Sequence, residues 1–287
     1  MALKDLLVYV DETECALERL RLAADLARRH KSHLIALYVE QLSAAQIEQQ
    51  ATDELGLDCA ADMRELDRRN DESMAKGAER MRLALELLAQ EKSIDTEWRC
   101  LKGIASVLVP QHARHADLCI LDHELAVDVN PAGYSFSEQM IFVTGRPVLF
   151  VPVTGHFETL GRRLLVAWNS SRVSARALHD ALPLIERAEH TTVLMVNPAK
   201  FINRHGALPP KQMLEHLRRH DATVEGIEIG DVPADSIANV IQAEAHKVGA
   251  DLTVAGAFGH PRLWEKALGG VTRELLAHMD MPTLMSH

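Results

Sequence analysis

The residues whose types and spacing point most clearly to chemistry are glycines near the C-terminal end of the sequence. Gly256 and Gly259 follow an apolar run, and Gly269 and Gly270 precede a predicted helix that contains Thr272. Glycine has no Cβ, so its backbone N–H groups can approach an anion closely, and the first turn of a helix adds unpaired N–H groups. The pattern predicts a loop that binds phosphate groups.

A structural role for the same glycines is the alternative. Gly256 fits the end of a strand, and Gly269 with Gly270 fits an ordinary turn before a helix. The sequence contains no G-x-x-x-x-G-K-[ST] loop, and no G-x-G-x-x-G follows the strand that opens each half. Both interpretations stay open at this point. His260, directly after Gly259, is either a phosphate contact or a solvated loop residue.

The composition is that of a globular protein of about two domains, with 287 residues, 47% hydrophobic and 25% charged. No apolar run approaches the ~20 residues of a transmembrane helix, and the first residues lack the apolar segment of a signal peptide. We therefore expect a cytoplasmic protein that does not associate with membranes.

The net charge of −10 disfavours nucleic acid as a partner, because duplex binding relies on Lys and Arg to neutralise phosphates. The charge is uneven along the sequence. The first half, residues 1–160, has 17 basic and 27 acidic residues, whereas the second half, residues 161–287, has 14 of each. The neutral second half is thus the more favourable host for an anionic nucleotide.

Cysteine and histidine spacing gives no sign of a metal site. His112 and His115 stand at helical i, i+3 spacing without an evident third ligand, so solvated helix residues are the better interpretation. The cysteines show no C-x-x-C pair, which favours reduced thiols, mostly in the core, over disulfides or zinc ligands. These cysteines are Cys15, Cys59, Cys100 and Cys119.

The two halves repeat one pattern. The first half begins with an apolar run that ends at Asp11, followed by an amphipathic helix and a second apolar run. The second half repeats this order with a run that ends at Asn169, a helix to about Ala188 and a run that ends at Val196. Short apolar runs that alternate with amphipathic helices indicate parallel strands covered by helices on both faces. In such sheets, ligands bind at the carboxyl ends of the strands.

The predicted fold class is therefore α/β, with two tandem domains at residues 1–153 and 161–287. Each domain is expected to hold a five-stranded, mostly parallel sheet sandwiched by helices. The first domain carries a long helical insertion at about residues 43–92. Residues 152–160 form the predicted linker.

The chain resembles the universal stress protein family in its tandem, two-domain form. The resemblance rests on the two β-α repeats, on a G-x-P-A-x-x-I turn with an extra residue at 230–237, and on the G-x2-G-x9-G spacing. It covers essentially the whole chain. It implies flavodoxin-like domains of the adenine nucleotide alpha hydrolase type, fused into an intramolecular pseudo-dimer. Whether two such chains form a homodimer is left open.

The resemblance also implies a site for ATP or a related adenine nucleotide, with or without Mg²⁺, in the second domain. Val196 falls at the strand end that contacts adenine, and Thr272 matches a hydroxyl that often follows the glycines. Two positions depart from the family pattern, because Gly270 replaces Ser or Thr and Asn169 replaces Asp. The expected site residues are Asn169, Val196, Gly256, Gly259, His260, Gly269, Gly270 and Thr272.

The first domain keeps the adenine position of the family but not its phosphate-binding glycines, whereas the second domain keeps the glycines and departs at the adenine position. It keeps Asp11 where relatives bind adenine, but Asp122, Glu124 and Asp128 occupy its phosphate segment. These carboxylates would repel a triphosphate, so we predict that this half does not bind ATP through the family's loop. Asp11 is instead expected to cap the helix that begins near Thr13.

No catalytic base or nucleophile is evident. Ser170 and Ser171 lack the G-x-S-x-G context of a nucleophile elbow, and either is a natural N-cap for the next helix. We therefore expect a nucleotide-binding regulatory protein of the stress response, not an enzyme, with protein partners that the sequence does not identify. The alternatives are a purely structural or interaction protein and a slow ATPase.

Overall fold

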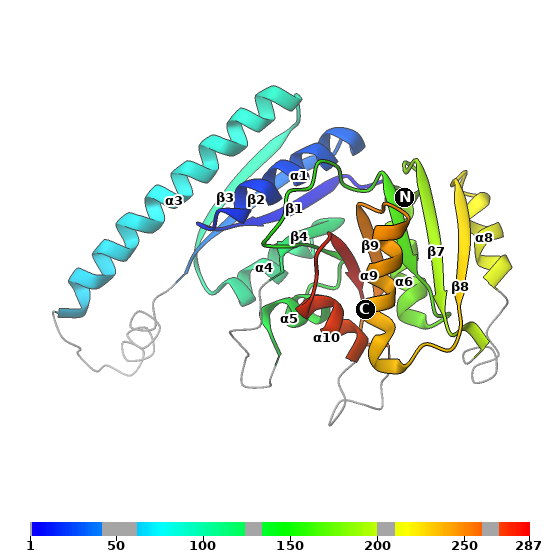
Figure 1. Ribbon diagram of the computed structural model, residues 1–287. Helices are drawn as coiled ribbons and strands as arrows, with labels where there is room; N and C mark the ends of the chain where they lie inside the picture. The colour runs from blue at the N-terminus through cyan, green and yellow to red at the C-terminus, as the bar shows by residue number, and fades with distance from the viewer. Residues whose placement is uncertain (1, 42–61, 124–133, 200–209, 260–269) are drawn as a thin grey trace.

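The computed structural model describes residues 2–41, 62–123, 134–199, 210–259 and 270–287 (Figure 1). The first half contains β1 (Asp5–Val10), α1 (Cys15–His30), β2 (His33–Gln41), α3 (Asp62–Lys92), β3 (Thr96–Gly103), α4 (Ala105–Ala113), β4 (Leu118–Asp122), α5 (Phe136–Val143) and β5 (Val148–Val151). The second half contains β6 (Arg163–Ala167), α6 (Arg172–Ile185), β7 (His190–Val196), α8 (Pro210–Arg218), β8 (Val224–Ile229), the 3-10 helix η1 (Ala234–Ser236), α9 (Ile237–Lys247), β9 (Leu252–Gly256), α10 (Gly270–Ala277) and β10 (Thr283–Ser286).

The two halves have the same strand order. It is β3-β2-β1-β4-β5 in the first half and β8-β7-β6-β9-β10 in the second, and all neighbours within a half are parallel. The predicted α/β class and parallel sheets are confirmed. The halves join edge to edge, because β10 runs antiparallel to β5 with Leu284 opposite Leu149. The result is one ten-stranded sheet rather than two separate ones.

Side chains at the junction reinforce this strand pairing. The Phe142 ring of α5 stacks on Phe258 of the second half, with ring centroids 4.6 Å apart. Arg273 of α10 forms an ion pair with the buried Glu138 of α5, with a distance of 2.6 Å from Nε to Oε1. Strand pairing, aromatic packing and a charge pair thus hold the halves together along one edge.

Helices cover both faces of the sheet and make two hydrophobic cores. The α1, α3, α6 and α8 helices pack on one face and the α4, α5, α9 and α10 helices on the other. Alternation along β1 illustrates the division, because Leu6 and Val8 enter the first core while Leu7 and Tyr9 enter the second. Successive side chains of a strand point to opposite faces, so a continuous apolar run is needed to fill both.

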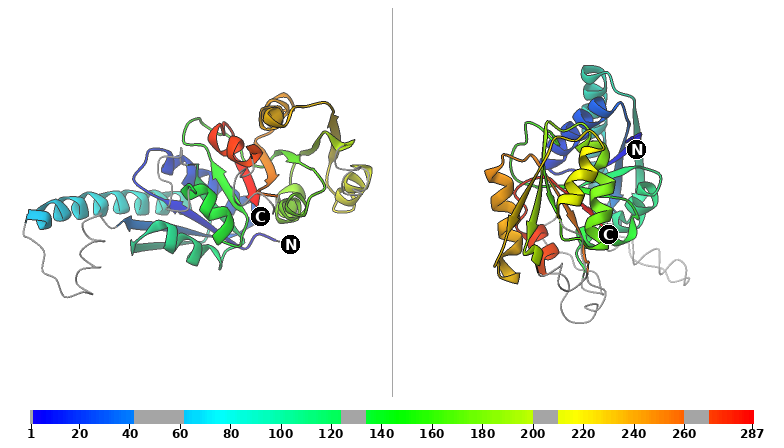
Figure 2. Two further views of the ribbon diagram at one scale, coloured as in Figure 1. Left: turned by 90° about the horizontal axis from the view of Figure 1, so that it is seen from below. Right: turned by 90° about the vertical axis from the view of Figure 1, so that its right-hand side faces the viewer.

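The predicted insertion contributes α3, which extends past the sheet at one end of the molecule (Figures 1 and 2). Met81 and Leu85, in its C-terminal part, are buried in the first core. Residues 42–61 of the insertion lie outside the described residues. No helix in the described parts is long and apolar enough to cross a membrane.

The linker after β5 is held against α1. The Phe157 N–H donates to Glu18 Oε1 at 3.0 Å, and Arg21 donates to the Phe157 carbonyl oxygen. Arg21 and Glu18 also form an ion pair at 2.8 Å. These contacts keep the linker folded back on the first half.

The three described cysteines are free thiols, as predicted, but the expected core position is right for one of them only. Cys119 is fully buried in β4, but Cys15 is half-buried and Cys100 is exposed. Cys100 lies on β3, an outer edge of the sheet, and this position explains its exposure. Cys59 lies outside the described residues.

Candidate functional site

The predicted site residues gather where β6, β7 and β9 end. These strands are parallel neighbours, with Ala167 of β6 opposite Leu194 of β7 and Ala255 of β9. Asn169 lies just beyond β6, and Val196 and Gly256 are the last residues of β7 and β9. Their carboxyl ends therefore lie at one edge of the sheet, as predicted.

Gly256 is held tightly against the start of α6. A Cβ at this position would lie 2.5 Å from the Ser174 nitrogen and 2.5 Å from the Val173 carbonyl carbon. A Cβ on Gly259 would lie 3.0 Å from Val173 Cγ2. The absence of a side chain at Gly256 thus lets β9 pack on the first turn of α6. This supports the structural interpretation of Gly256, and it also places the glycine segment beside a helix N-terminus.

Asn169 and Ser171 shape the turn into α6. The Asn169 side-chain oxygen accepts a hydrogen bond from the Ser171 N–H at 3.1 Å. Ser171 Oγ accepts one from the Ser174 N–H at 3.2 Å, so Ser171 is the N-cap, as one of the two predicted serines. Asn169 is exposed, and its carbonyl oxygen keeps a second lone pair for another donor.

Thr272 connects α10 to the glycine segment. It is buried, and its Oγ1 accepts a hydrogen bond from the Phe258 N–H at 3.2 Å. A Cβ on Gly270, the first residue of α10, would meet no atom of the described residues within 4 Å, so packing against them does not require glycine there. His260 and Gly269 lie outside the described residues.

Asn197 is a residue of this edge that the sequence interpretation missed. It is buried, and it bridges the end of β7 to the turn after β8. Its side-chain nitrogen donates to the Val232 carbonyl at 2.7 Å, and its oxygen accepts from the Val232 N–H at 2.9 Å. The Asn-Pro dipeptide directly after an apolar run was the available signal for a turn.

The charge around this site is favourable to an anion. Residues 168–173, 256–259 and 270–273 contain two arginines, Arg172 and Arg273, and no Asp or Glu. Arg273 is engaged by Glu138. The described part of the chain contains no cluster of three or more His, Cys, Asp or Glu that could hold a metal ion. His112, considered above as a ligand, instead has its Nδ1 3.0 Å from Arg99 Nη1.

The equivalent edge of the first half is filled by Arg19 of α1. Its side chain is fully buried, and its Nε donates to the Tyr9 carbonyl at 2.7 Å. Nη2 lies 3.2 Å from Asp11 Oδ2, and Nη1 lies 3.1 Å from Asp122 Oδ2. Burial opposes the charge of Arg19, but Asp122 and Asp11 outweigh it and raise the pKa of the guanidinium. The two strand tips are thus joined by a buried ion triad.

Two first-half predictions change as a result. Asp11 is not the helix cap, because α1 begins at Cys15 and its N-cap residue, Glu14, makes no side-chain cap bond. Asp11 accepts from the Thr13 N–H at 2.9 Å and pairs with Arg19 instead. Asp122 is buried and neutralised by Arg19, so it does not present a free charge. Glu124 and Asp128 lie outside the described residues.

The α3 helix adds a second contact at this edge. Glu12, next to Asp11, accepts a hydrogen bond from Tyr38 Oη at 3.0 Å, and its carbonyl accepts one from Arg80 of α3 at 2.8 Å. A Cβ on Gly77 of α3 would lie 2.7 Å from Glu12 Cγ. The insertion therefore packs directly on the loop that follows β1.

Comparison with solved structures identifies the fold. A universal stress protein from Archaeoglobus fulgidus DSM 4304 superposes with a TM-score of 0.69 at 16% identity, covering 98% of this chain and 95% of that one. A functionally unknown protein from Pseudomonas aeruginosa PAO1 gives a TM-score of 0.56 at 16% identity, covering 99% and 92%. A Pseudomonas aeruginosa UCBPP-PA14 protein provisionally assigned to the universal stress proteins gives 0.55 at 18%, covering 99% and 93%.

No protein-family model and no curated protein sequence matches the chain. Over its whole length, the chain has the fold of the universal stress proteins, as the resemblance implied.

Proposed function

We propose that the second half binds ATP or a related adenine nucleotide at the ends of β6, β7 and β9, and that this binding regulates contacts with partner proteins in a cytoplasmic stress response. The single observation that carries the proposal is the position of residues 256–259. This glycine segment lies on the first turn of α6, where the positive end of the helix dipole favours an anion.

Each end of the nucleotide has candidate contacts. We expect Asn169 and Val196, at neighbouring strand ends, to contact adenine. The Asn169 side-chain oxygen would then accept hydrogen bonds from both the Ser171 N–H and the adenine amino group. We expect Gly256 and Gly259 to approach the phosphates. Thr272 supports this segment through Phe258, and its hydroxyl proton remains available to an acceptor.

We expect weaker binding than in a relative with the full family motif. Gly270 supplies no hydroxyl where the family has Ser or Thr, and a lost hydrogen bond to a charged phosphate costs about 1.5–3 kcal/mol, or roughly tenfold or more in affinity. The described segments of the site supply no carboxylate for Mg²⁺. We therefore expect Mg²⁺ to act mainly by neutralising the phosphates, with its remaining ligands from water.

A regulatory role is proposed rather than catalysis. Turnover of ATP would need a group that positions or activates water and cations that stabilise the transferred phosphoryl group. In the described part of the site, Arg273 is paired with Glu138, and residues 168–173, 256–259 and 270–273 contain no Asp or Glu that could act as a base. A structural or interaction protein without a nucleotide is the alternative, and the packing of Gly256 on α6 favours it as the next candidate.

Calorimetric titration of ATP into the full-length protein, with and without Mg²⁺, tests the proposal. We expect one site per chain. A matched pair of variants isolates the site: Gly259→Ala adds a Cβ near Val173, whereas Gly259→Asp adds a carboxylate at the same place. Binding should survive the first change with a modest loss and disappear in the second. Two sites per chain would contradict the filled first half, and no binding up to millimolar ATP would favour the structural alternative.

A further inference from the structure

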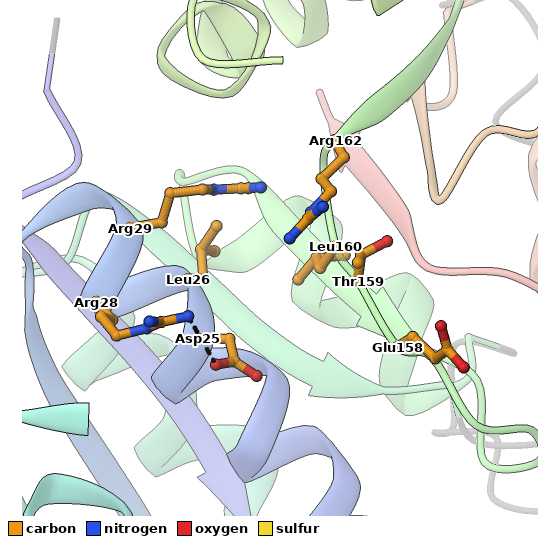
Figure 3. Close-up of a pocket in the computed structure, with 8 residues that line it drawn as sticks. All are labelled: Asp25, Leu26, Arg28, Arg29, Glu158, Thr159, Leu160 and Arg162. Carbon is orange, nitrogen blue, oxygen red and sulfur yellow. Dashed lines mark ion pairs between the residues drawn. The ribbon is translucent and has the colours of Figure 1, made fainter. Parts of the chain in front are cut away.

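A second candidate site lies at the opposite end of the sheet from the nucleotide site. A pocket of about 390 Å³ lies between the end of α1 and the segment that leads from the linker into β6 (Figure 3). Its lining residues are Asp25, Leu26, Arg28, Arg29, Glu158, Thr159, Leu160 and Arg162. Arg29 precedes β2 and Arg162 precedes β6, so both stand where strands begin. The predicted nucleotide contacts stand where strands end. This pocket therefore belongs to neither nucleotide site.

Arg29 enters this pocket with unused hydrogen-bond donors. Its Nε and Nη2 are buried and have no hydrogen-bond partner, and no carboxylate forms an ion pair with it within the described ranges. The guanidinium lies directly on the linker backbone. A Cβ on Gly161, whose φ is 71°, would lie 2.9 Å from Arg29 Nη2. Arg29 as a whole is half-buried, and buried guanidinium nitrogens without partners are costly unless an anion offsets their charge.

Two further arginines, Arg162 and Arg187, lie near Arg29. The Arg29 and Arg162 guanidinium groups point toward one another across the pocket (Figure 3). Arg187 of the second half donates a hydrogen bond to the Arg29 carbonyl oxygen. Burial lowers the pKa of Arg29, and Arg162 and Arg187 lower it further, while Asp251 opposes them. Like charges collected at one place favour a bound counter-anion.

The nearby carboxylates are already engaged or turned away. Asp25 pairs with Lys92 at 2.7 Å and with Arg21 at 3.1 Å. Asp251 accepts hydrogen bonds from the backbone of Arg162 and Arg163 at 2.9 and 3.0 Å and from Thr159 Oγ1 at 2.6 Å.

Glu158, at the far side of the pocket, is exposed, and its carboxylate points away from Arg29 in Figure 3. Arg28 pairs with Asp25 at 3.8 Å, and Arg162 pairs with the exposed Glu189 at 3.5 Å. Among the described residues, Arg29 is thus the arginine of the pocket that no carboxylate neutralises, and a phosphate would compete with Glu189 for Arg162.

We propose that this pocket binds a phosphate dianion, either inorganic phosphate or the terminal phosphate of a small monoester, between Arg29 and Arg162. Guanidinium groups bind phosphate oxygens through paired, charge-assisted hydrogen bonds, and a dianion balances two of them where a single carboxylate would not. Because the pocket is formed by α1 and the linker, a bound phosphate would fix the junction of the two halves. The inference is independent of nucleotide binding by the second half.

His30 provides a spectroscopic readout of the site. It is buried beside Arg29, and burial, with Arg29 and Arg187, lowers its pKa to about 4. A phosphate between the arginines would offset their repulsion of the charged imidazole. We therefore expect phosphate, added above about pH 7.5 where it is a dianion, to shift the NMR resonances of the His30 ring protons.

The test is thermal unfolding of the full-length protein with inorganic phosphate, against chloride at matched ionic strength. We expect a saturable increase in Tm. Arg29→Gln should weaken phosphate binding at least tenfold, and Arg162→Gln, at a side chain that is 59% exposed, should weaken it without risk to folding. The matched control, Arg176→Gln, removes an exposed arginine that pairs with Asp180 on α6 and should change nothing.

Gly259→Asp separates this site from the nucleotide site, because phosphate stabilisation should persist in that variant while ATP binding is lost. Tighter binding of glycerol phosphate than of inorganic phosphate would identify a monoester as the ligand, and the reverse would identify the free ion. The proposal is overturned if stabilisation by phosphate does not saturate, if it survives in both Arg29→Gln and Arg162→Gln, or if Gly259→Asp removes it.

Discussion

The two halves of this chain share one strand order, but different residues occupy the carboxyl ends of their strands. In the first half, Arg19 reaches from α1 to Asp11 and Asp122 and closes the edge with a buried ion triad. In the second half, the position equivalent to Arg19 is Ala177, and Gly256 takes the place of Asp122. The glycine lets β9 pack on α6.

The difference shows that one strand order can carry, at the ends of its strands, either charges that neutralise each other or an uncharged glycine segment. Removing Arg19 alone would leave Asp122 buried without its partner, and removing Asp122 alone would leave the buried Arg19 with only the partly exposed Asp11. Each charge of the triad is therefore stabilised by the others. In the second half, Ala177 and Gly256 stand at the positions of Arg19 and Asp122, so no ion pair among the described residues covers the backbone at these strand ends.

The largest expected effect comes from breaking the triad in the first half. Arg19→Met should cost about 3–5 kcal/mol of unfolding free energy, because Asp122 is left buried without its partner. Urea unfolding of the variant, compared with the parent, gives this value. Adding Asp122→Asn should recover part of the loss, with a coupling of about 0.5–3 kcal/mol.

A loss below about 1 kcal/mol in Arg19→Met would show that the triad contributes no more than a surface pair does. Strict additivity with Asp122→Asn would likewise show that the two residues do not act as a unit.

A smaller effect is expected from the glycines of the second half, which form a matched pair. Gly256→Ala places a Cβ 2.5 Å from backbone atoms of α6 and should destabilise the protein by about 1–3 kcal/mol. Gly270→Ala, where a Cβ meets no atom of the described residues within 4 Å, should change stability by no more than about 1 kcal/mol and in the favourable direction. Chemical unfolding of both variants makes the comparison, and equal effects would refute the close packing of β9 on α6.

A further effect concerns the pH dependence of stability and the end of α1. Burial, with Arg29 and Arg187, lowers the pKa of His30 from 6.5 to about 4 in the folded protein. The unfolded chain then binds the proton more readily, so the stability that neutral His30 provides is complete above pH 6.5 and is lost as the pH falls toward 4. The equivalent residue of the second half is Ala188.

Replacing His30 with that alanine should therefore flatten the stability profile between pH 6.5 and 4 by up to about 1.4 kcal/mol per pH unit. Urea unfolding across this range in phosphate-free buffer measures the slope. His156→Ala, at a histidine whose side chain is 70% exposed, is the control and should leave the slope nearly unchanged. An unaltered slope in His30→Ala would contradict the lowered pKa.

Much of the fold could be predicted from the sequence because its signals are local. The apolar runs at β1 and β6, the helical stripes and the internal repeat each reflect the period of a single element. The cap at Ser171 was equally local, since it depends on a serine and the helix that follows it. The tight contacts of Gly256 and the bridge made by Asn197 were not local, because their partners lie on other elements.

The sequence by itself determined which residues form strands and helices, that the pattern occurs twice, and that the glycines of the second half have no counterpart in the first. Only the tertiary structure decided that the two sheets merge through β5 and β10, that Arg19 fills the first strand edge, and that Arg29 and Arg162 face one another. The physical reason is that an arginine on an amphipathic helix has the same local pattern whether it meets water or a buried carboxylate. Its energetic role is set by residues that lie far away along the chain and are brought next to it only by folding.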